Sequence, residues 1–229
     1  AERVWRWSRR NREIASLAAG ILLLLVCVAG AALWGWHQSQ KVAATRGELA
    51  SKLALEGGQR LLDEKNWRGA LSYFDYAMEL KPDLAAAHYG RGRAHEGLGR
   101  FDLAKNDFNK AIEVGPGDPE TYFHRGAFHS RRREFELAAA DYEEALRVNP
   151  AHARTHLNKG ILNRDLERPA DAMNSFSEAI RLDPRLARAH GGRALLLQDE
   201  HRLEQALREF DIAIGIAPKE PELLSNRAK

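Results

Sequence analysis

Cysteine is nearly absent from this 229-residue chain, whose only thiol, Cys27, lies within a long apolar run. A single cysteine excludes an internal disulfide and a zinc site built from thiolates. A strong excess of one charge is also missing, since 35 basic residues face 32 acidic ones. The surplus lies in residues 1–13, which carry five arginines and two glutamates, while residues 37–229 carry 30 of each sign. We therefore predict no basic surface for nucleic acid and no nucleic-acid partner.

The motifs that mark common enzyme classes are missing as well. The sequence has no nucleophile elbow, no HExxH zinc motif, no phosphate-binding loop and no N-x-S/T glycosylation site. Gly90-Arg91-Gly92 resembles half of a dinucleotide fingerprint, but it lacks the third glycine and a preceding strand. We predict no catalytic residues, no cofactor and no enzymatic activity in these residues.

Residues 14–36 form a run of 23 residues without a charge. That is the length of a helix that crosses a membrane. Trp5 and Trp7 precede the run, and Trp34 and Trp36 stand at its end, as expected of anchors at the two headgroup regions. The run predicts a transmembrane helix and a lipid bilayer as a partner.

Basic residues are unequally distributed around this run. Five arginines lie in the basic tail of residues 1–13, against Lys41, Arg46 and Lys52 on the other side. The positive-inside rule predicts a single-pass membrane protein with a cytoplasmic N-terminus and a periplasmic or extracellular remainder. The alternative is a cleaved secretory signal, because Ala29-Gly30-Ala31 has the form of a cleavage site. A soluble secreted protein would then remain.

A period of 34 residues runs through the rest of the chain, in the units 51–84, 85–118, 119–152, 153–186 and 187–220. The eighth position is small, the twentieth and twenty-seventh are alanine, and an aromatic residue lies between the alanines on the same helical face. We expect helices to approach closely at the alanines, with the ring filling the gap between helix pairs. Proline, which cannot continue a helix, stands at the thirty-second position of every unit: Pro82, Pro116, Pro150, Pro184 and Pro218.

This pattern resembles the tetratricopeptide repeat (TPR) over residues 51–220. The resemblance implies an all-α fold, a right-handed superhelical solenoid of helix-turn-helix repeats, preceded here by one transmembrane helix. It also implies a concave groove, lined by the first helix of each repeat, that holds extended peptides or partner helices. The function expected is that of a membrane-anchored scaffold for protein–protein interaction.

In that family the second, fifth, sixth, ninth and thirteenth positions line the groove. Arginine and aromatic residues alternate there, which favours an extended peptide that carries carboxylates. The alternative is a solvated inner face without a specific ligand. The carboxylate clamp of chaperone-binding members is not reproduced, so we expect no chaperone tails. The predicted lining is Tyr89, Arg93, Glu120, Phe123, His124, Arg131, Arg154, Leu157, Asn158 and Arg188.

The seventh position departs from the family, which commonly has leucine there. Units two, three and five combine an arginine at this position with an acid at the twenty-third. Since the two occur together, we predict an ion pair between the two helices of one repeat, which the planar fork of arginine suits, in preference to phosphate binding. The predicted pairs are Arg91 with Asp107, Arg125 with Asp141, and Arg193 with Glu209.

The histidines do not predict a metal site. Most of them fall at the fourth or eleventh position of a repeat, where side chains pack in this family: His88, His156, His190, His95 and His129. His152 lies four residues before His156 but in a turn, which does not suit a pair of ligands on one helix.

Two short segments flank the repeats. Residues 37–50 lack proline and predict a helical linker that runs directly into the first repeat, although Gly47, Gly57 and Gly58 weaken such a helix. Residues 221–229 repeat the opening of a unit and read as the truncated start of a sixth.

Residues 4–20 (VWRWSRRNREIASLAAG) are similar to the segment before the membrane span of bacterial eukaryotic-like Ser/Thr kinases, where W-R-W-C-R-R-N is common. Ser8 replaces the cysteine of that motif and Arg12 a common proline. The resemblance implies an alternative function, as the transmembrane and exterior docking or sensing part of a receptor-like kinase whose catalytic domain is absent from this chain. Ser16 and Gly20 form a small-xxx-small pair that favours a dimer through the membrane helix.

Overall fold

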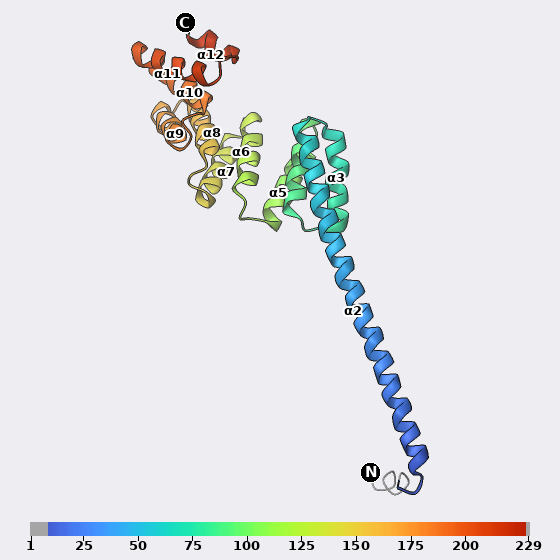
Figure 1. The fold of residues 1–229 in the computed structure, drawn as a ribbon. Helices are drawn as coiled ribbons and strands as arrows, with labels where there is room; N and C mark the ends of the chain where they lie inside the picture. Colours follow the sequence, from blue (N-terminus) through green and yellow to red (C-terminus); the bar gives the residue numbers. More distant parts are fainter. Residues whose placement is uncertain (1–8, 228–229) are drawn as a thin grey trace.

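The chain folds into a row of antiparallel helix pairs carried on one long helix (Figure 1). The structure is a computed structural model that describes residues 9–227, and within this range it contains helices and turns but no β-strand. Trp5 and Trp7, expected as membrane anchors, lie outside the described residues. The helices are α2 (Arg12–Asp63), α3 (Trp67–Leu80), α4 (Ala85–Gly97), α5 (Phe101–Val114), α6 (Pro119–Arg131), α7 (Phe135–Val148), α8 (Ala153–Asp165), α9 (Pro169–Leu182), α10 (Ala187–Asp199), α11 (Leu203–Ile216) and α12 (Pro221–Arg227).

Each 34-residue unit forms two helices, as the repeat predicts. The end of α2 pairs with α3, α4 with α5, α6 with α7, α8 with α9, and α10 with α11. Every second helix ends two residues before the proline of its unit, so that α3 ends at Leu80 before Pro82 and α11 ends at Ile216 before Pro218. The prolines therefore mark helix ends, as predicted.

The small and aromatic positions form the core. The alanines at the twentieth and twenty-seventh positions are buried, with exposed fractions of 3% or less. The aromatic residues between them are 2% exposed or less: Phe74, Phe108, Tyr142, Phe176 and Phe210. A repeat thus buries one ring between its own helices and the next first helix.

The predicted ion pairs are present within the repeats. Arg91 donates from Nε to Oδ2 of Asp107 at 2.9 Å and from Nη2 to Oδ1 at 2.7 Å. The hydrogen bond with Asp107 raises the pKa of Arg91 above its usual value. Arg193 donates one hydrogen bond, from Nη2 to Oε1 of Glu209 at 2.5 Å.

The basic residue at the seventh position has a second partner that the sequence pattern did not predict. It contacts the twenty-fifth position of the preceding repeat, and at Arg91 and Arg125 one side chain therefore connects three helices of two repeats. Lys159, whose own repeat has Ser175 instead of an acid at the twenty-third position, makes only this contact with the preceding repeat. The contacts are Arg91 to Asp75 at 2.9 Å, Arg125 to Asn109 at 2.8 Å, Lys159 to Glu143 at 3.7 Å and Arg227 to Asp211 at 2.6 Å.

Histidines at the fourth position also connect repeats. The Nε2 atom of His88 donates to the carbonyl of Pro82 at 3.0 Å, and His190 donates to that of Pro184 at 3.1 Å. A carbonyl freed at the end of one repeat is thereby satisfied by the first helix of the next. These histidines therefore have the structural role that the sequence predicts.

The long helix α2 continues without a break through the apolar run, the linker and the first helix of the first repeat. Its 52 residues extend over about 78 Å. Gly57 lies where α2 packs on α3, and a Cβ there would come within 2.5 Å of the Tyr73 ring, so close packing offsets the weak helix propensity of glycine.

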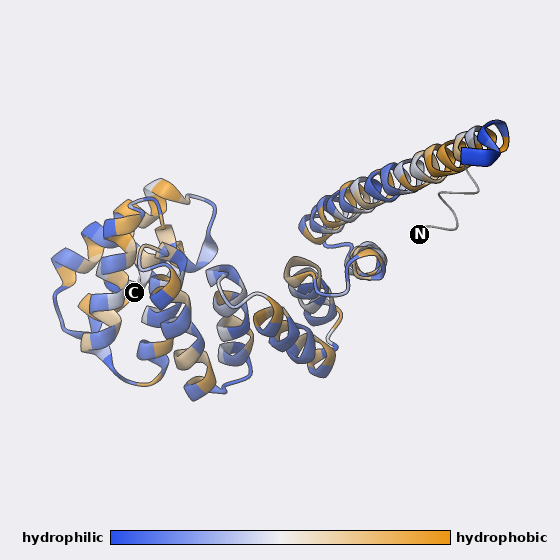
Figure 2. Cartoon of the chain, turned by 90° about the horizontal axis from the view of Figure 1, so that it is seen from below, coloured by the Kyte–Doolittle hydropathy of each residue, from blue (hydrophilic) through white to orange (hydrophobic). Residues whose placement is uncertain are grey.

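The apolar part of α2 projects away from the repeats, and Figure 2 shows its hydrophobic residues gathered toward the N-terminal end. Its large side chains are exposed, for example Leu23 at 69% and Trp34 at 68%. By length and composition this helix could cross a membrane.

Candidate binding groove on the first helices

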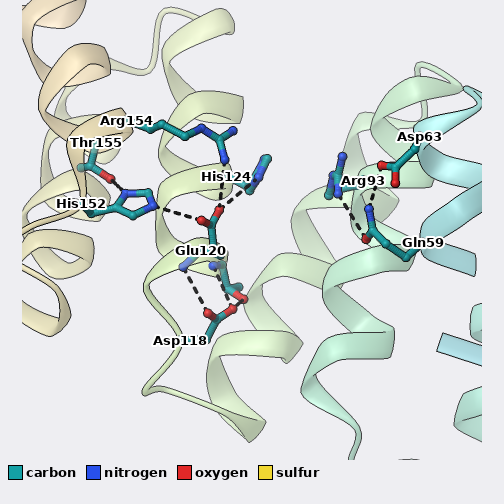
Figure 3. Close-up of polar contacts among 10 residues, drawn as sticks. Gln59, Asp63, Arg93, Asp118, Glu120, His124, His152, Arg154 and Thr155 are labelled. Atoms are coloured by element: carbon teal, nitrogen blue, oxygen red, sulfur yellow. Dashed lines mark hydrogen bonds and ion pairs between the residues drawn. The ribbon is translucent and has the colours of Figure 1, made fainter. Parts of the chain in front are cut away.

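The predicted groove residues lie on the first helices of four successive repeats. Figure 3 shows that several of these side chains point toward one another between α6 and α8. Tyr89 and Arg93 are on α4, Glu120, Phe123, His124 and Arg131 on α6, Arg154, Leu157 and Asn158 on α8, and Arg188 on α10.

Glu120 lies at the centre of a polar cluster at the start of α6. The carboxylate of Asp118 caps this helix by accepting hydrogen bonds from the backbone N–H groups of Glu120 at 3.2 Å and Thr121 at 3.1 Å. The Glu120 side chain accepts a hydrogen bond from Nε2 of His152 at 3.0 Å and lies 3.7 Å from Nη1 of Arg154 (Figure 3). Glu120 thereby connects the third repeat to the fourth.

Phe123 forms the apolar base of this cluster. It is 5% exposed and packs edge-on against His124, with ring centroids 4.9 Å apart, and against His152 at 5.3 Å. The guanidinium of Arg154 lies 4.6 Å from the Phe123 centroid, within the range of a cation–π contact. The Arg154 side chain is 54% exposed, so its N–H groups remain accessible to a ligand.

Tyr89 extends the cluster to the second repeat. Its ring lies 5.3 Å from that of His124, and the guanidinium of Arg93 lies 5.7 Å from its centroid. Arg93 also donates a long hydrogen bond of 3.5 Å to Gln59. Burial raises the pKa of Tyr89 to about 12, so its hydroxyl is neutral at physiological pH.

His124 is neutral in this setting. Burial, reinforced by the positive charges of Arg93 and Arg154, lowers its pKa to about 3. Its 3.6 Å contact with Glu120 therefore joins a carboxylate to an uncharged ring and is not an ion pair at neutral pH.

A cleft of about 830 Å³ opens beside the cluster. It includes three of the predicted lining residues, Arg93, His124 and Arg131. Its other side chains lie at repeat positions that the family pattern does not assign to the groove, so they were not predicted. They are Trp67, Glu96, Phe101, Phe128 and Arg132.

The remaining predicted residues lie elsewhere. Leu157 is 6% exposed and belongs to the core of the fourth repeat. The side chain of Asn158 lies beside that of Tyr142. Arg188 is exposed and lines a separate hollow of about 130 Å³, together with Leu223 of α12. The structure thus brings together the predicted residues of α4 and α6 with Arg154.

His152 is part of the cluster, although the sequence analysis discussed it only as a candidate metal ligand. Its position in the turn before α8 brings its ring over Phe123 and its Nε2 to Glu120. Over residues 9–227, no group of three or more His, Cys, Asp or Glu side chains is arranged to hold a metal ion.

The chain matches a protein-family model and solved structures. The family model described as "Tetratricopeptide repeat" matches residues 55–127, 129–184 and 157–221. No curated protein matches the chain.

Solved structures with the same fold include PilF of Pseudomonas aeruginosa, at 21% identity and a TM-score of 0.74, over 78% of this chain and 81% of that one. TTC0263 of Thermus thermophilus has 24% identity and a TM-score of 0.65, over 78% and 97%. YrrB, described as a TPR protein with an unusual peptide-binding site, has 22% identity and a TM-score of 0.59, over 77% and 91%. At these identities the likeness shows the fold.

Proposed function

This chain belongs to the tetratricopeptide repeat family, and from that premise we propose that it holds an extended, acidic peptide segment of a partner protein in the groove of its first helices. TPR domains bind protein or peptide partners and typically act as scaffolds without catalysis. The acidic ligand and the membrane anchor are the specific parts of the proposal.

The arrangement of Arg154 carries the argument for an acidic ligand. Its guanidinium is fixed over the Phe123 ring, and its nearest carboxylate, Glu120, is 3.7 Å away, longer than a hydrogen bond. Glu120 already accepts a shorter hydrogen bond from His152. A carboxylate of a ligand could therefore accept two hydrogen bonds from the planar fork of Arg154.

Charge and aromatic rings continue along the groove from this point. Arg93 lies over Tyr89, two repeats before Arg154, and Arg188 is exposed one repeat after it. Arg131 stands on the first helix between them. An extended peptide running along the first helices would meet a basic residue at each repeat. Ring contacts would accompany those charges at Tyr89 and Phe123.

Charge reversal tests this function. We expect Arg154→Glu combined with Arg188→Glu to abolish binding of fluorescent acidic peptides by the full chain in lipid nanodiscs, followed by anisotropy. The matched control is Arg147→Glu with Arg181→Glu, which makes the same charge change on second helices where these side chains are 68% and 67% exposed. Equal binding by both double variants would reject the groove as the site.

The membrane part of the proposal places residues 14–36 across a bilayer, with the N-terminus cytoplasmic and the repeats periplasmic or extracellular. At 1.5 Å per residue the run extends over about 35 Å, enough for a hydrocarbon core of about 30 Å. The exposure of Leu23 and Trp34, on the part of α2 that projects away from the repeats, supports this placement.

Extraction and labelling test the anchor and its orientation. We expect the full chain to stay in membranes washed with alkaline carbonate, whereas a form cleaved after the apolar run would be released. In a Cys27→Ala background, a cysteine introduced at Lys219 should react with an impermeant maleimide added outside intact cells. Labelling only after lysis would show that the repeats lie on the cytoplasmic side, opposite to the proposed orientation.

A second candidate is the exterior docking or sensing part of a bacterial receptor-like kinase, with the catalytic domain elsewhere in a longer protein. It rests on the similarity of residues 4–20, of which 4–8 lie outside the described residues. A kinase reading frame continuous with Ala1 in the gene would favour this candidate, and a start codon directly before Ala1 would remove it.

A further inference from the structure

We propose that the cleft between the second and third repeats receives one large apolar side chain, preferably aromatic, from a partner segment whose flanking residues are acidic. The proposal rests on the proposed function, because it names the residue that would fix the register of the bound peptide. The cleft of about 830 Å³ has the size of a ligand site. It lies where first helices turn into second helices, since Gly97 ends α4 and Phe101 begins α5.

The cleft exists because the sixth position of the third repeat is not glycine. At the junctions before the second and fifth repeats, Gly90 and Gly192 occupy this position, and the ring of the preceding repeat lies directly on them. A Cβ at Gly90 would come within 2.3 Å of Phe74, and one at Gly192 within 2.6 Å of Phe176. The third repeat has His124 instead, so α6 cannot approach α5 as closely.

The packing of α5 and α6 agrees with this interpretation. Among the junctions between complete repeats, α5 and α6 approach each other least closely, and Figure 1 shows α6 standing apart from α5. The ring of Phe108 packs against Phe128, with centroids 5.8 Å apart, and His124 packs against Tyr89. The space that a closer α6 would fill is the cleft.

Aromatic rings form the apolar wall. Phe101 is 44% exposed and lies 6.3 Å from the buried ring of Phe128. Trp67 begins α3 and lies against Gly97, where a Cβ would come within 2.5 Å of the indole. These rings favour an aromatic occupant, which can pack against both Phe101 and Trp67.

The rim of the cleft is positive. Arg93, Arg131 and Arg132 line it together with a single acid, Glu96, which pairs with Arg131. The guanidinium of Arg132 lies 5.3 Å from the Phe101 centroid, and its Nε donates to Glu134 at 3.2 Å. An inserted ring would therefore have cations beside it, and acidic neighbours in the peptide would be attracted to the rim.

The charge pattern favours a peptide over an uncharged apolar molecule. Three arginines around one apolar wall match a side chain that carries acidic residues on either side, and two of them, Arg93 and Arg131, also belong to the groove. A small aromatic anion would use the wall and one arginine. It would not depend on residues further along the groove such as Arg154.

Selection of peptides provides the test. The full chain in lipid nanodiscs is used to select binders from a random library of 12-residue peptides. The affinities of the enriched peptides are then measured by fluorescence anisotropy. We expect an aromatic residue with acidic neighbours in the enriched set. Replacing that residue by alanine should weaken binding about tenfold or more, the scale of burying a phenyl ring.

Variants of the chain locate the effect. Phe101→Ala should weaken the aromatic peptide about as much as removal of its ring does, yet leave the alanine peptide unchanged, and Phe101→Leu should be intermediate. Leu103→Ala is the control, because Leu103 is on the same helix, is 48% exposed and does not line the cleft. Arg154→Glu with Arg188→Glu should weaken both peptides.

The outcomes separate this inference from the groove itself. Acidic peptides that bind without an aromatic residue, or without sensitivity to Phe101→Ala, would overturn the cleft and leave the groove in place. Free 3-phenylpropionate that competes as well as the peptide would also overturn it, in favour of a small-anion site. A library that yields no peptide would overturn both proposals.

Discussion

The Arg125 guanidinium on α6 holds the Asp141 carboxylate on α7 through two parallel hydrogen bonds, from Nε to Oδ2 at 2.9 Å and from Nη2 to Oδ1 at 2.6 Å. The Asp141 side chain is only 5% exposed and that of Arg125 is 21% exposed. Each partner of such a pair depends on the other, because removing one leaves a buried charge unpaired, which is costly.

Removing the carboxylate should therefore destabilise the third repeat. We expect Asp141→Ala to lower the free energy of unfolding by about 3 kcal/mol, because it leaves Arg125 without its carboxylate partner. The melting temperature of the full chain in detergent, followed by circular dichroism, measures the effect. Glu144→Ala is the control, since Glu144 pairs with Arg147 on an exposed face and should contribute about 1 kcal/mol or less. Equal melting temperatures would mean that the buried pair does not stabilise the repeat.

The turn inside each repeat supplies a second prediction. Its fifteenth position adopts a positive φ in every unit, with +72° at Gly99 and +56° at Glu167. A Cβ at Gly99 would meet nothing within 4 Å, so Gly99→Ala tests the backbone alone. The left-handed conformation costs an alanine about 1–2 kcal/mol, and the lower entropy of the unfolded chain returns part of it.

We expect Gly99→Ala to destabilise the chain by about 1 kcal/mol in urea unfolding. Glu167→Gly makes the opposite change at the same position of another repeat and should be neutral or slightly stabilising. If Gly99→Ala proved as stable as the parent, the positive φ would not constrain this turn.

The fold could be predicted from the sequence because its signals repeat. A proline at every thirty-second position and alanines beside each ring point to one helix pair per unit. The pairing of Arg91 with Asp107 followed from their joint occurrence. The contact of Arg91 with Asp75 was not predicted, because it depends on how one repeat is rotated relative to the next.

The site was less predictable for the same reason. Tyr89, Glu120 and His124 could be identified because repeat position determines which face of a helix a residue occupies. The cleft depends instead on the spacing of two repeats, which we attribute to the side chain of His124. A repeat pattern treats that position as variable and does not show which residue separates the helices.

The neutral state of His124 predicts a pH dependence of stability. The folded chain keeps this imidazole uncharged, with a pKa of about 3, whereas an unfolded histidine titrates near its usual pKa of 6.5. Between these values the unfolded state binds more protons, so stability is lost as the pH falls from about 6.5 toward 3. The titratable and charged groups near the ring are Tyr89 and Arg93 on α4, Glu120 and Arg131 on α6, His152 before α8, and Arg154 on α8.

We expect the urea midpoint of the parent to decrease from pH 7 to pH 5 more steeply than that of His124→Phe. The difference should approach, at most, about 1.4 kcal/mol per pH unit. Histidines outside this cluster contribute equally to both chains and cancel in the comparison. Parallel pH profiles would show that the His124 ring is hydrated and titrates normally.

The last prediction concerns the spacing of the second and third repeats. If His124 separates α5 from α6, then His124→Gly should let α6 move toward the ring of Phe108, as Gly90 and Gly192 allow at their own junctions. Helix axes in contact lie about 8–10 Å apart depending on the side chains between them, so the expected shift is about 1–2 Å. Spin labels at the exposed, equivalent positions Asp102 and Glu136, in a Cys27→Ala background, report it by pulsed electron resonance.

The matching control is Asn158→Gly, which makes the same kind of change at the following junction. It should leave the distance between labels at Asp102 and Glu136 unchanged, because both labels lie before that junction. A shorter distance in His124→Gly alone would identify one histidine as the cause of the opening, and the same variant should then lose its preference for an aromatic peptide. An unchanged distance would mean that the contacts of Phe128 with Phe101 and Phe108, and not His124, fix the separation of the repeats.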